Sequence, residues 1–293
     1  MTRIALISDI HSNPFALDAV IKDLESRHLD EVLVVGDLVG RGPMGNAVVE
    51  KILKKGWPSV RGNHEDYLIS FRDENVDEAW LTSEEWAASR WMASELSEAS
   101  MAAIRALPFS MRSKRCSDVV LFHGSPRSNS EGLGLWSEES LLKECLFSVD
   151  CEVMVVAHTH RAMAWEFEGR LLINVGSVGL PFNGNRAAQY AIIEKEKGRW
   201  VYEFVAVDYE LSLIEDAYEK SGFLSFGGIT ASLLLEELRH ARPFLVPFRR
   251  WLDLIGEEES WEEMRSFLEW YCCTLSSIEN VEIFHSKAAL RKA

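Results

Sequence analysis

Aspartate, asparagine and histidine residues closely follow five short apolar segments of this sequence, and such side chains bind metal ions or move protons. The apolar segments span residues 4–7, 32–35, 59–60, 119–122 and 153–156. The polar residues that follow them are Asp9 and His11, Asp37, Asn63 and His64, His123, and His158 and His160. A set of Asp, His and Asn without cysteine suits Mn, Fe, Zn, Ni or Co better than a soft metal. The pattern therefore predicts a metal site built from residues far apart in the sequence.

Two of these groups have a spacing that lets both side chains reach one centre. Asp9 and His11 are two residues apart, as are His158 and His160. In an extended chain, residues i and i+2 point to the same side, so each pair can present two ligands to one ion. The whole set holds enough ligands for two ions. Asp37 is the natural bridge, because a carboxylate can place one oxygen on each metal.

The front of the chain alternates short apolar runs with helical patterns. We expect strands at 4–7 and 32–35, and a weaker one at 59–60. Helices are expected from Pro14, with proline at the first helical position, and over residues 43–53. This order is typical of parallel βαβ units. In an open α/β sheet, ligands bind beyond the carboxyl ends of the strands, so the polar residues should converge at one edge.

The rest of the chain predicts further strands and then helices. We expect a helical segment over about 72–107, which ends before Pro108. Further strands are expected at 119–122, 153–156, 171–173, 190–193 and 200–207. They follow one another so closely that part of this half should be antiparallel. The pattern is helical after about residue 210. One face of a terminal helix should carry Trp261, Met264, Phe267, Leu268, Tyr271 and Leu275.

The charge balance limits the kinds of partner that this chain can bind. Among 293 residues, 46 Asp and Glu outnumber 31 Lys and Arg, which gives a formal net charge of −15. Binding of long nucleic acid needs clustered Lys and Arg, so we expect no long nucleic acid as a partner. Phosphate chemistry in so acidic a protein needs a local positive centre such as a metal. No apolar run reaches the length of a membrane helix, so we expect no membrane partner.

Cysteine usage and the N-terminus indicate a cytoplasmic protein. The five cysteines form an odd number, and no two of them have the Cys-x-x-Cys spacing. Free thiols are typical of a reducing compartment. The apolar stretch near the N-terminus is too short for a signal peptide and ends at Asp9.

Five short motifs taken together resemble those of the calcineurin-like metallophosphoesterases. The motifs are Asp9-x-His11, Gly36-Asp37, Gly62-Asn63-His64-Glu65, His123-Gly124 and His158-x-His160. The similarity spans roughly residues 1–210. It is greatest to the bacterial and archaeal branch described as phosphodiesterases or diadenosine-tetraphosphatase-like proteins. Ala157 stands where the family usually has glycine, and Arg41 stands where this branch often has tyrosine.

The resemblance implies a fold and a division of the chain. The family has an α/β (α+β) fold, a four-layer α/β/β/α sandwich of two mixed β-sheets flanked by helices. Residues 1–210 would form this metallophosphoesterase domain. Residues 211–293 lie outside the resemblance, and their helical pattern predicts a C-terminal extension that packs on the same domain.

The resemblance also implies roles for individual residues. One metal would be held by Asp9, His11, Asp37 and His160. The second metal would be held by Asp37, Asn63, His123 and His158. His64 would be the catalytic histidine and would not bind metal. The cofactors would be two divalent or trivalent ions, with Mn the best suited to support activity.

The expected function is a dimetal-dependent phosphoesterase that acts on a small phosphodiester or a nucleotide-type phosphate ester. A hydroxide between two ions about 3.5–4 Å apart would attack phosphorus in line, and His64 would protonate the leaving group. The alternatives are a phosphomonoesterase or protein serine/threonine phosphatase, and a non-catalytic interaction module on the same fold. Such modules usually lack metal ligands or the catalytic histidine, whereas every expected position is filled in this sequence.

Two further residues each allow two interpretations. Arg41 is either a phosphate clamp, because guanidinium pairs bidentately with phosphate, or a surface or ion-paired arginine. Asn13 either positions substrate or caps the helix that begins at Pro14, and the capping role is favoured.

Overall fold

The chain divides into two compact units, one from Met1 to Arg242 and the other from Pro243 to Ala293. The computed structural model describes residues 2–73 and 76–275. Residue 210, the expected end of the first domain, lies inside the first unit, and helices that follow it pack against earlier helices there. The assignment of residues 211–293 as one extension stays a prediction.

The first sheet of the first unit has four strands in the order β2-β1-β8-β9. These strands are β1 (Arg3–Ile7), β2 (Glu31–Val34), β8 (Ala188–Glu196) and β9 (Arg199–Val207). β1 and β2 are parallel, whereas β8 pairs antiparallel with both β1 and β9. The expected parallel start of the chain is therefore confirmed, and it continues into a pair of strands from much later in the sequence.

The second sheet has five strands in the order β3-β4-β5-β7-β6. These strands are β3 (Ser110–Arg112), β4 (Val119–Phe122), β5 (Val153–Val156), β6 (Met163–Phe167) and β7 (Arg170–Asn174). β4, β5 and β7 are parallel, and the edge strands β3 and β6 pair antiparallel with them. The two edge strands are missing from our prediction, because they are short and only partly buried.

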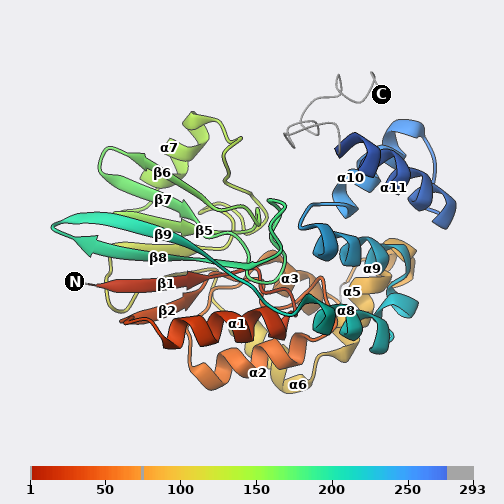
Figure 1. Ribbon diagram of the computed structural model, residues 1–293, viewed down its shortest axis with the longest axis horizontal. Helices are drawn as coiled ribbons and strands as arrows, with labels where there is room; N and C mark the ends of the chain where they lie inside the picture. Colours follow the sequence, from red (N-terminus) through yellow and green to blue (C-terminus); the bar gives the residue numbers. More distant parts are fainter. Residues whose placement is uncertain (1, 74–75, 276–293) are drawn as a thin grey trace. The chain divides into compact units, whose positions relative to one another are not determined.

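Helices cover the outer faces of both sheets (Figure 1). In the first unit the helical elements are α1 (Pro14–Glu25), α2 (Gly45–Lys55), α3 (Asn63–Ser70), α4 (Glu78–Thr82), η1 (Glu84–Trp86), α5 (Ala87–Glu95), α6 (Glu98–Arg105), α7 (Glu139–Phe147), α8 (Leu211–Lys220) and α9 (Phe223–His240). Figure 1 shows α1 and α2 along the four-stranded sheet and α7 along the five-stranded one. The layers thus run helix, sheet, sheet, helix, as the resemblance implies.

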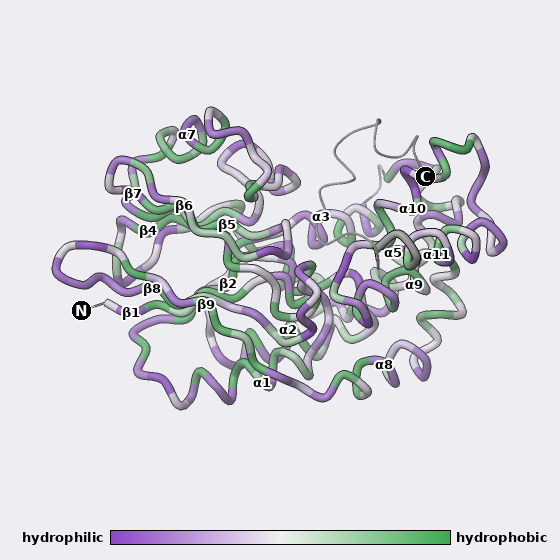
Figure 2. The backbone as a smooth tube through the Cα atoms, turned by 45° about the horizontal axis from the view of Figure 1, so that its top comes forward, coloured by the Kyte–Doolittle hydropathy of each residue, from purple (hydrophilic) through white to green (hydrophobic). Residues whose placement is uncertain are grey.

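The main core lies between the two sheets. Leu6 and Leu33 of the first sheet pack with Leu121 and Val155 of the second, and all four side chains are inaccessible to solvent. Figure 2 shows hydrophobic residues gathered along these central strands. A second cluster, which includes Met154 and residues of α7, fills the outer face of the five-stranded sheet. Apolar burial on both faces makes this sheet a rigid support for the loops at its end.

Two local expectations differ from the structure. Residues 59–60 form no full strand, because Ser59 makes only an isolated parallel bridge to Val34. The helical segment expected over 72–107 is divided among α4, η1, α5 and α6, with extended backbone at Ser83 and at Ser97 between them. Ser97 then caps α6, because its hydroxyl accepts a hydrogen bond from the N–H of Ser100.

The second unit contains two described helices, α10 (Leu245–Ile255) and α11 (Trp261–Leu275). Met264, Phe267 and Tyr271 form the buried face of α11, as its spacing predicts, whereas the side chain of Trp261 is about half exposed. The side chain of Leu275 lies outside the described residues. None of the helices within residues 2–73 and 76–275 is long and apolar enough to span a membrane.

Shortening Leu6 tests whether the two sheets share one core. Leu6→Ala removes a fully buried side chain from the contact between the sheets, and we expect the free energy of unfolding to fall by about 2–5 kcal/mol. Urea denaturation followed by circular dichroism measures the change. Leu53→Ala is the control, because Leu53 is 60% exposed. Similar losses in both variants would contradict the packing described above.

Candidate metal centre

The loops that follow β1 and β2 lie side by side at the carboxyl end of the four-stranded sheet. Asp9 N–H donates to the carbonyl of Gly36, and His11 N–H donates to the carbonyl of Asp37, both at 3.1 Å. Ser12 N–H donates in turn to the carbonyl of Leu38. These bonds extend the contact between the two chain segments beyond the ends of both strands. As a result, Asp9, His11 and Asp37 occupy one small region.

The site loops contain many residues in a backbone conformation that L-residues rarely adopt. Those with positive φ are Asp9, His11, Ser12, Asp37, Arg41, His158 and His160, with φ between 48° and 66°. This left-handed conformation costs about 1 kcal/mol or more for each residue. Such strain persists only where the surrounding structure imposes it, and it gathers at functional sites. The backbone therefore marks these loops as functional, independently of their side chains.

Two buried aspartates each keep one oxygen atom without a hydrogen-bond donor. Asp9 Oδ2 accepts from the N–H of His158 at 3.3 Å, and Asp37 Oδ1 accepts from the N–H of His64 at 2.9 Å. Asp9 Oδ1 and Asp37 Oδ2 have no hydrogen-bond partner among the described residues. A buried carboxylate oxygen without a partner is costly. A cation at this place would remove that cost, so the donor atoms fit a metal.

Three histidines are oriented by hydrogen bonds from their outer ring nitrogen to backbone carbonyls. Nδ1 of His123 donates to the carbonyl of Val35 (2.7 Å), and Nδ1 of His160 donates to that of Leu180 (2.5 Å). Nδ1 of His11 donates to the carbonyl of Val39 (3.3 Å). A carbonyl only accepts, so each Nδ1 carries a proton, and each Nε2 faces the buried aspartates, where a metal ion would compete with a second proton. Metal-binding histidines are typically oriented in this way.

The first ligand group consists of Asp9, His11 and His160. The Nε2 atoms of His11 and His160 lie 3.0 Å apart, and they lie 3.6 and 3.2 Å from Asp9 Oδ1. These three atoms lie within 4.8 Å of one another. Three lone pairs that face one another at such distances repel unless a cation or proton lies between them. The group can therefore hold one metal ion.

The second ligand group consists of Asp37, His123 and His158, with Asn63 beside them. Asn63 Oδ1 lies 2.9 Å from His158 Nδ1 and 3.1 Å from His123 Nε2. Asp37 Oδ2 lies 3.2 Å from His123 Nε2 and 3.7 Å from His11 Nε2, so this oxygen faces both groups. Asp37 Oδ1 is engaged by a backbone N–H. Asp37 therefore lies between the two groups, and its role as a bridge between two metals stays a prediction.

Neighbouring charges change the pKa values of the buried aspartates and histidines of the site. Burial alone would raise the pKa of Asp37, but the neighbouring His123 holds that pKa well below its usual range. Burial likewise would lower the pKa of His123, yet the adjacent Asp37 carboxylate raises it to about 10. Both aspartates are thus held as anions, because the pKa of Asp9 is also lowered by His160 against the effect of its burial. Anionic oxygens are the ligands that divalent cations need.

Glu65 ties the ligand loops together. Its buried carboxylate accepts hydrogen bonds from backbone N–H groups on two segments of the chain. The donors are Asp37 (3.0 Å), Leu38 (2.7 Å), Val39 (3.2 Å) and Gly62 (2.7 Å). Burial and the charge of Asp37 raise the pKa of Glu65 to about 7, and the backbone donors oppose that increase. Glu65 therefore fixes the loop of Asp37 against the start of α3, which carries Asn63 and His64.

His64 contacts Arg41 and forms a third candidate group with His11 and Asp37, because one ligand atom of each lies within 4.8 Å of the others. Its Nε2 accepts a hydrogen bond from Arg41 Nε at 3.1 Å, and its ring meets that of His11 edge-on at 5.0 Å. Burial lowers the pKa of His64 well below its usual range, although Asp37 opposes this effect. The ring is therefore neutral in this arrangement, with its proton on Nδ1. The catalytic role expected for His64 stays a prediction, and Arg41 is ion-paired with Glu237, which is one of its two interpretations.

Asn13 is occupied by the architecture of the site. Its Oδ1 accepts from the N–H of Ala16 and caps α1, as favoured from the sequence. Its Nδ2 donates to the carbonyl of Gly179 and to the hydroxyl of Tyr209. The side chain is buried, so we retain the capping role and propose no substrate contact for Asn13.

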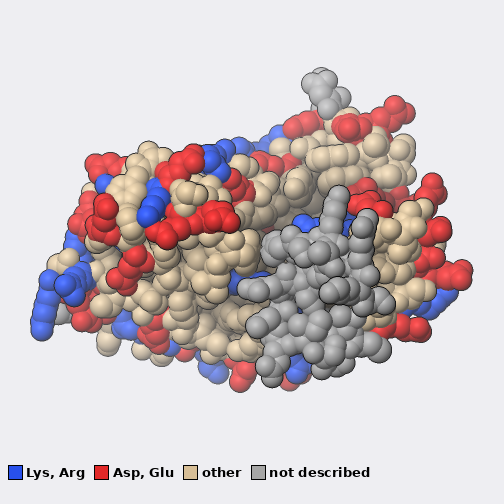
Figure 3. All heavy atoms as spheres, turned by 90° about the horizontal axis from the view of Figure 1, so that it is seen from above, with Lys and Arg blue, Asp and Glu red and all other residues tan. Residues whose placement is uncertain are grey.

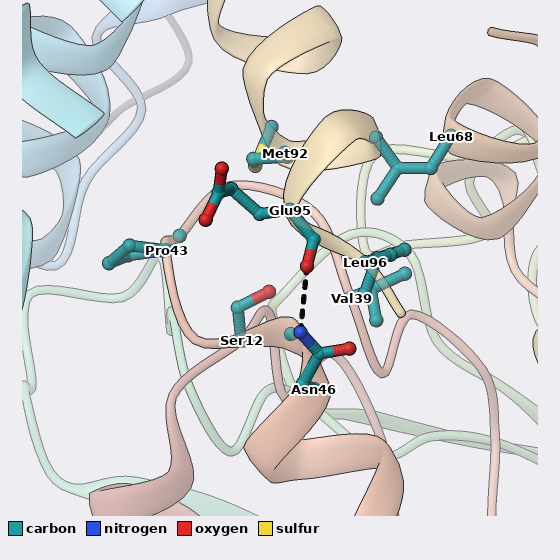
Figure 4. A pocket seen from close by; sticks show the side chains of 10 residues that line it. Ser12, Val39, Pro43, Asn46, Leu68, Met92, Glu95 and Leu96 are labelled. Carbon is teal, nitrogen blue, oxygen red and sulfur yellow. Dashed lines mark hydrogen bonds between the residues drawn. The ribbon is translucent and has the colours of Figure 1, made fainter. Parts of the chain in front are cut away.

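A small pocket lies between Pro43, Asn46 and residues of α5 (Figure 4). Ser12, Val39, Met92 and Leu96 are among the side chains around it, and it offers about 10 Å³ to the centre of a water molecule. Such a volume holds at most a single water. The pocket is therefore a gap in the packing beneath the site and no place for a substrate.

The stacked mixed sheets, together with aspartate and histidine ligands beyond their strand ends, define a metallophosphoesterase. Comparison with family models agrees, since the model described as calcineurin-like phosphoesterase matches residues 2–162. This match covers more than half of the chain, and the chain belongs to the calcineurin-like phosphoesterase family. Membership makes the protein a hydrolase of phosphoric esters and agrees with the candidate metal ligands.

Relatives and solved structures show the same similarity. An uncharacterized protein of Methanocaldococcus jannaschii is 31% identical over 237 residues, which cover 75% of this chain and 91% of the relative. A metallophosphoesterase from Sphaerobacter thermophilus has 25% identity and a TM-score of 0.64, over 80% of this chain and 99% of that one. A hypothetical protein from Pyrococcus horikoshii has 20% identity and a TM-score of 0.70, over 83% and 100% of the two chains.

The structure brings together all the residues that the sequence predicts as ligands, and it also reveals contributors that the prediction lacks. Glu65 is part of the motif Gly62-Asn63-His64-Glu65, but only the fold shows that it accepts hydrogen bonds from two loops. Phe182, whose ring stacks on His160 at 4.3 Å, and Glu237, which pairs with Arg41, have no local signal in the sequence.

Replacing Glu65 tests its role in shaping the ligand loops. In Glu65→Gln, one amide N–H₂ would meet backbone N–H groups that need an acceptor, so the loop of Asp37 should shift. We expect the affinity for Mn²⁺, measured by titration calorimetry, to fall about 10–100-fold, the usual cost of losing a residue that supports metal ligands. Asp66→Asn is the matched control, because Asp66 is partly exposed and pairs with Arg61. Unchanged affinity in Glu65→Gln would refute the role.

Proposed function

We propose that this protein is a dimetal phosphoesterase that hydrolyses a small phosphodiester or a nucleotide-type phosphate ester. The main support is the pair of buried carboxylate oxygens, Asp9 Oδ1 and Asp37 Oδ2, which lack donors and face inward-pointing imidazole nitrogens. A non-catalytic module on this fold has no need to retain two complete ligand groups together with a histidine beside them.

The residues present fit two ions of Mn, Fe, Zn, Ni or Co. We propose that one ion is held by Asp9, His11, Asp37 and His160, and the other by Asp37, Asn63, His123 and His158, with Mn the best candidate to support activity. When bound, such ions stabilise negative charge on a phosphoryl group and lower the pKa of a water molecule toward about 7. The ligand set has no cysteine, which favours these metals over softer ones.

His64 and Arg41 supply the groups that act on the substrate itself. The guanidinium of Arg41 can bind non-bridging phosphate oxygens, since arginine matches phosphate geometry. His64, next to Arg41 and edge-on to His11, can donate a proton to the leaving oxygen or a hydrogen bond to the phosphate. In the structure its Nε2 is an acceptor for Arg41. The proton on Nδ1 is therefore the one that His64 can donate while Arg41 keeps its position.

The surface charge supports a small substrate. Figure 3 shows Asp and Glu spread over the visible face, with Lys and Arg scattered among them rather than gathered in a stripe. The formal net charge of −15 repels a polyanion. We therefore propose a small phosphate ester as the substrate, and no long nucleic acid as a partner. The cytoplasmic location and the lack of a membrane partner that the sequence suggests stay predictions.

Hydrolysis of two chromogenic esters tests the function and separates its alternatives. We expect the Mn-loaded protein to cleave bis-p-nitrophenyl phosphate faster than p-nitrophenyl phosphate, and chelation with EDTA to abolish both activities. The opposite order would identify a phosphomonoesterase, including the serine/threonine phosphatase alternative. No hydrolysis of either ester, together with no bound metal, would indicate an interaction module. Cyclic nucleotides and dinucleoside polyphosphates then extend the screen.

Replacing His64 separates catalysis from metal binding. Because general-acid help is worth about 10²–10⁴-fold, His64→Gln should lower kcat by about that factor. Elemental analysis should find the same metal content as in the wild type, since His64 is assigned no metal. His28→Gln is the control, because His28 is exposed. A parallel loss of metal in His64→Gln would show instead that His64 is a ligand.

A further inference from the structure

Helix α9 reaches the edge of the candidate site through one buried carboxylate. The side chain of Glu237 is only 1% exposed, and its Oε2 pairs with Nη1 of Arg41 at 2.5 Å. The two residues are 196 positions apart in the sequence. A buried carboxylate is costly unless it is paired, so α9 is placed with its charge directed at an arginine that borders the metal groups.

Arg41 is restrained at further points. Its Nε donates to His64 Nε2 at 3.1 Å, and its carbonyl accepts a hydrogen bond from the hydroxyl of Tyr218 on α8. Its backbone has a φ of 56°. The preceding Gly40 also has a positive φ, and a Cβ atom there would lie 2.5 Å from the ring of His64. The chain around Arg41 is therefore packed against His64 with no room for a side chain between them.

These restraints leave one part of the guanidinium for another partner. Glu237 binds Nη1 and His64 binds Nε, whereas Nη2 has no hydrogen bond to any of the residues that the structure describes. The Arg41 side chain is 15% exposed, so solvent reaches it. A guanidinium is planar, and two fixed nitrogens therefore determine the direction of the third. Nη2 is held ready for an acceptor from outside, beside the metal ligands.

We infer that Glu237 is a positioning residue of the active site, which holds Arg41 in the orientation that binds a phosphate oxygen of the substrate. The inference rests on the proposed phosphoesterase function and extends the site to a helix beyond residue 210. The alternative is an ion pair that only attaches α9 to the rest of the unit. That alternative has no need for Arg41 to contact His64.

Single variants give the first test. Glu237→Gln keeps the size of the side chain and removes its charge, so Arg41 loses its orientation. We expect kcat/KM for bis-p-nitrophenyl phosphate to fall about 10-fold or more, mainly through a higher KM, with unchanged metal content. Glu236→Gln is the matched control on the same helix, because Glu236 pairs with Arg239 and His240 instead. Equal activity in Glu237→Gln and wild type would overturn the inference.

A double-mutant cycle separates positioning from simple attachment. If Glu237 acts through Arg41, then Glu237→Gln should lower kcat/KM about 10-fold in the wild-type background but less than about 2-fold in an Arg41→Ala background. If the ion pair only attaches α9, both backgrounds should lose activity equally, and the inference is wrong. Thermal unfolding of each variant shows whether it is folded. If Glu237→Gln is unfolded, Glu237→Asp, which keeps the charge, replaces it, and kcat/KM is measured in the same two backgrounds.

Binding of inorganic phosphate provides a readout that does not depend on turnover. Calorimetric titration of the Mn-loaded full-length chain should show weaker phosphate binding in Glu237→Gln than in wild type, and no such difference in the Arg41→Ala background. A wild type that binds phosphate with this coupling but cleaves no ester would contradict the proposed function and leave the positioning role supported. Phosphate binding that is insensitive to Glu237 in both backgrounds would contradict the positioning role.

Discussion

The carboxylate of Glu65 is the constraint on which the geometry of the site depends. The turns after β2 and before α3 direct several backbone N–H groups toward the interior, where water cannot satisfy them. A buried N–H without an acceptor costs about as much as a lost hydrogen bond. One glutamate accepts from four of these groups on both turns. It thereby fixes the distance between Asp37 and Asn63, which belong to the same proposed ligand group.

Two features of the site are unfavourable for folding: backbone strain and buried charge. Seven residues of the site loops have left-handed backbone, and two buried carboxylate oxygens have no donor among the described residues. Both features are unfavourable for folding. The apolar core between the two sheets, with Leu6 and Leu121 fully buried, supplies the stability that offsets them. This division of labour explains why the ligands are on loops while central strands such as β4 and β5 are entirely apolar.

Features that depend on residues close together in the sequence were predictable, whereas contacts between residues far apart in the sequence mostly were not. The ligands were predictable because each follows an apolar strand, and parallel strands end at one edge of a sheet. The cap at Asn13 was predictable because its hydrogen bond is local. The hydrogen bond from the backbone N–H of His64 to Asp37 Oδ1 was not, because it joins residues 27 positions apart. The contacts of Glu237 and Tyr218 with Arg41 were not predictable either. Neither residue lies in a local pattern that indicates a partner some 180–200 residues earlier.

The place of Glu237 in the chain has a consequence for biosynthesis. During translation, the segment that carries Asp9 to His160 leaves the ribosome well before α9 is made, and domains tend to fold as units once their residues are available. The compact unit that holds the ligand loops runs to Arg242 and includes α9, so it is complete only after the carboxylate that pairs with Arg41 has been made. Maturation of the site is thus a late event, tied to the synthesis of the helix at Phe223–His240.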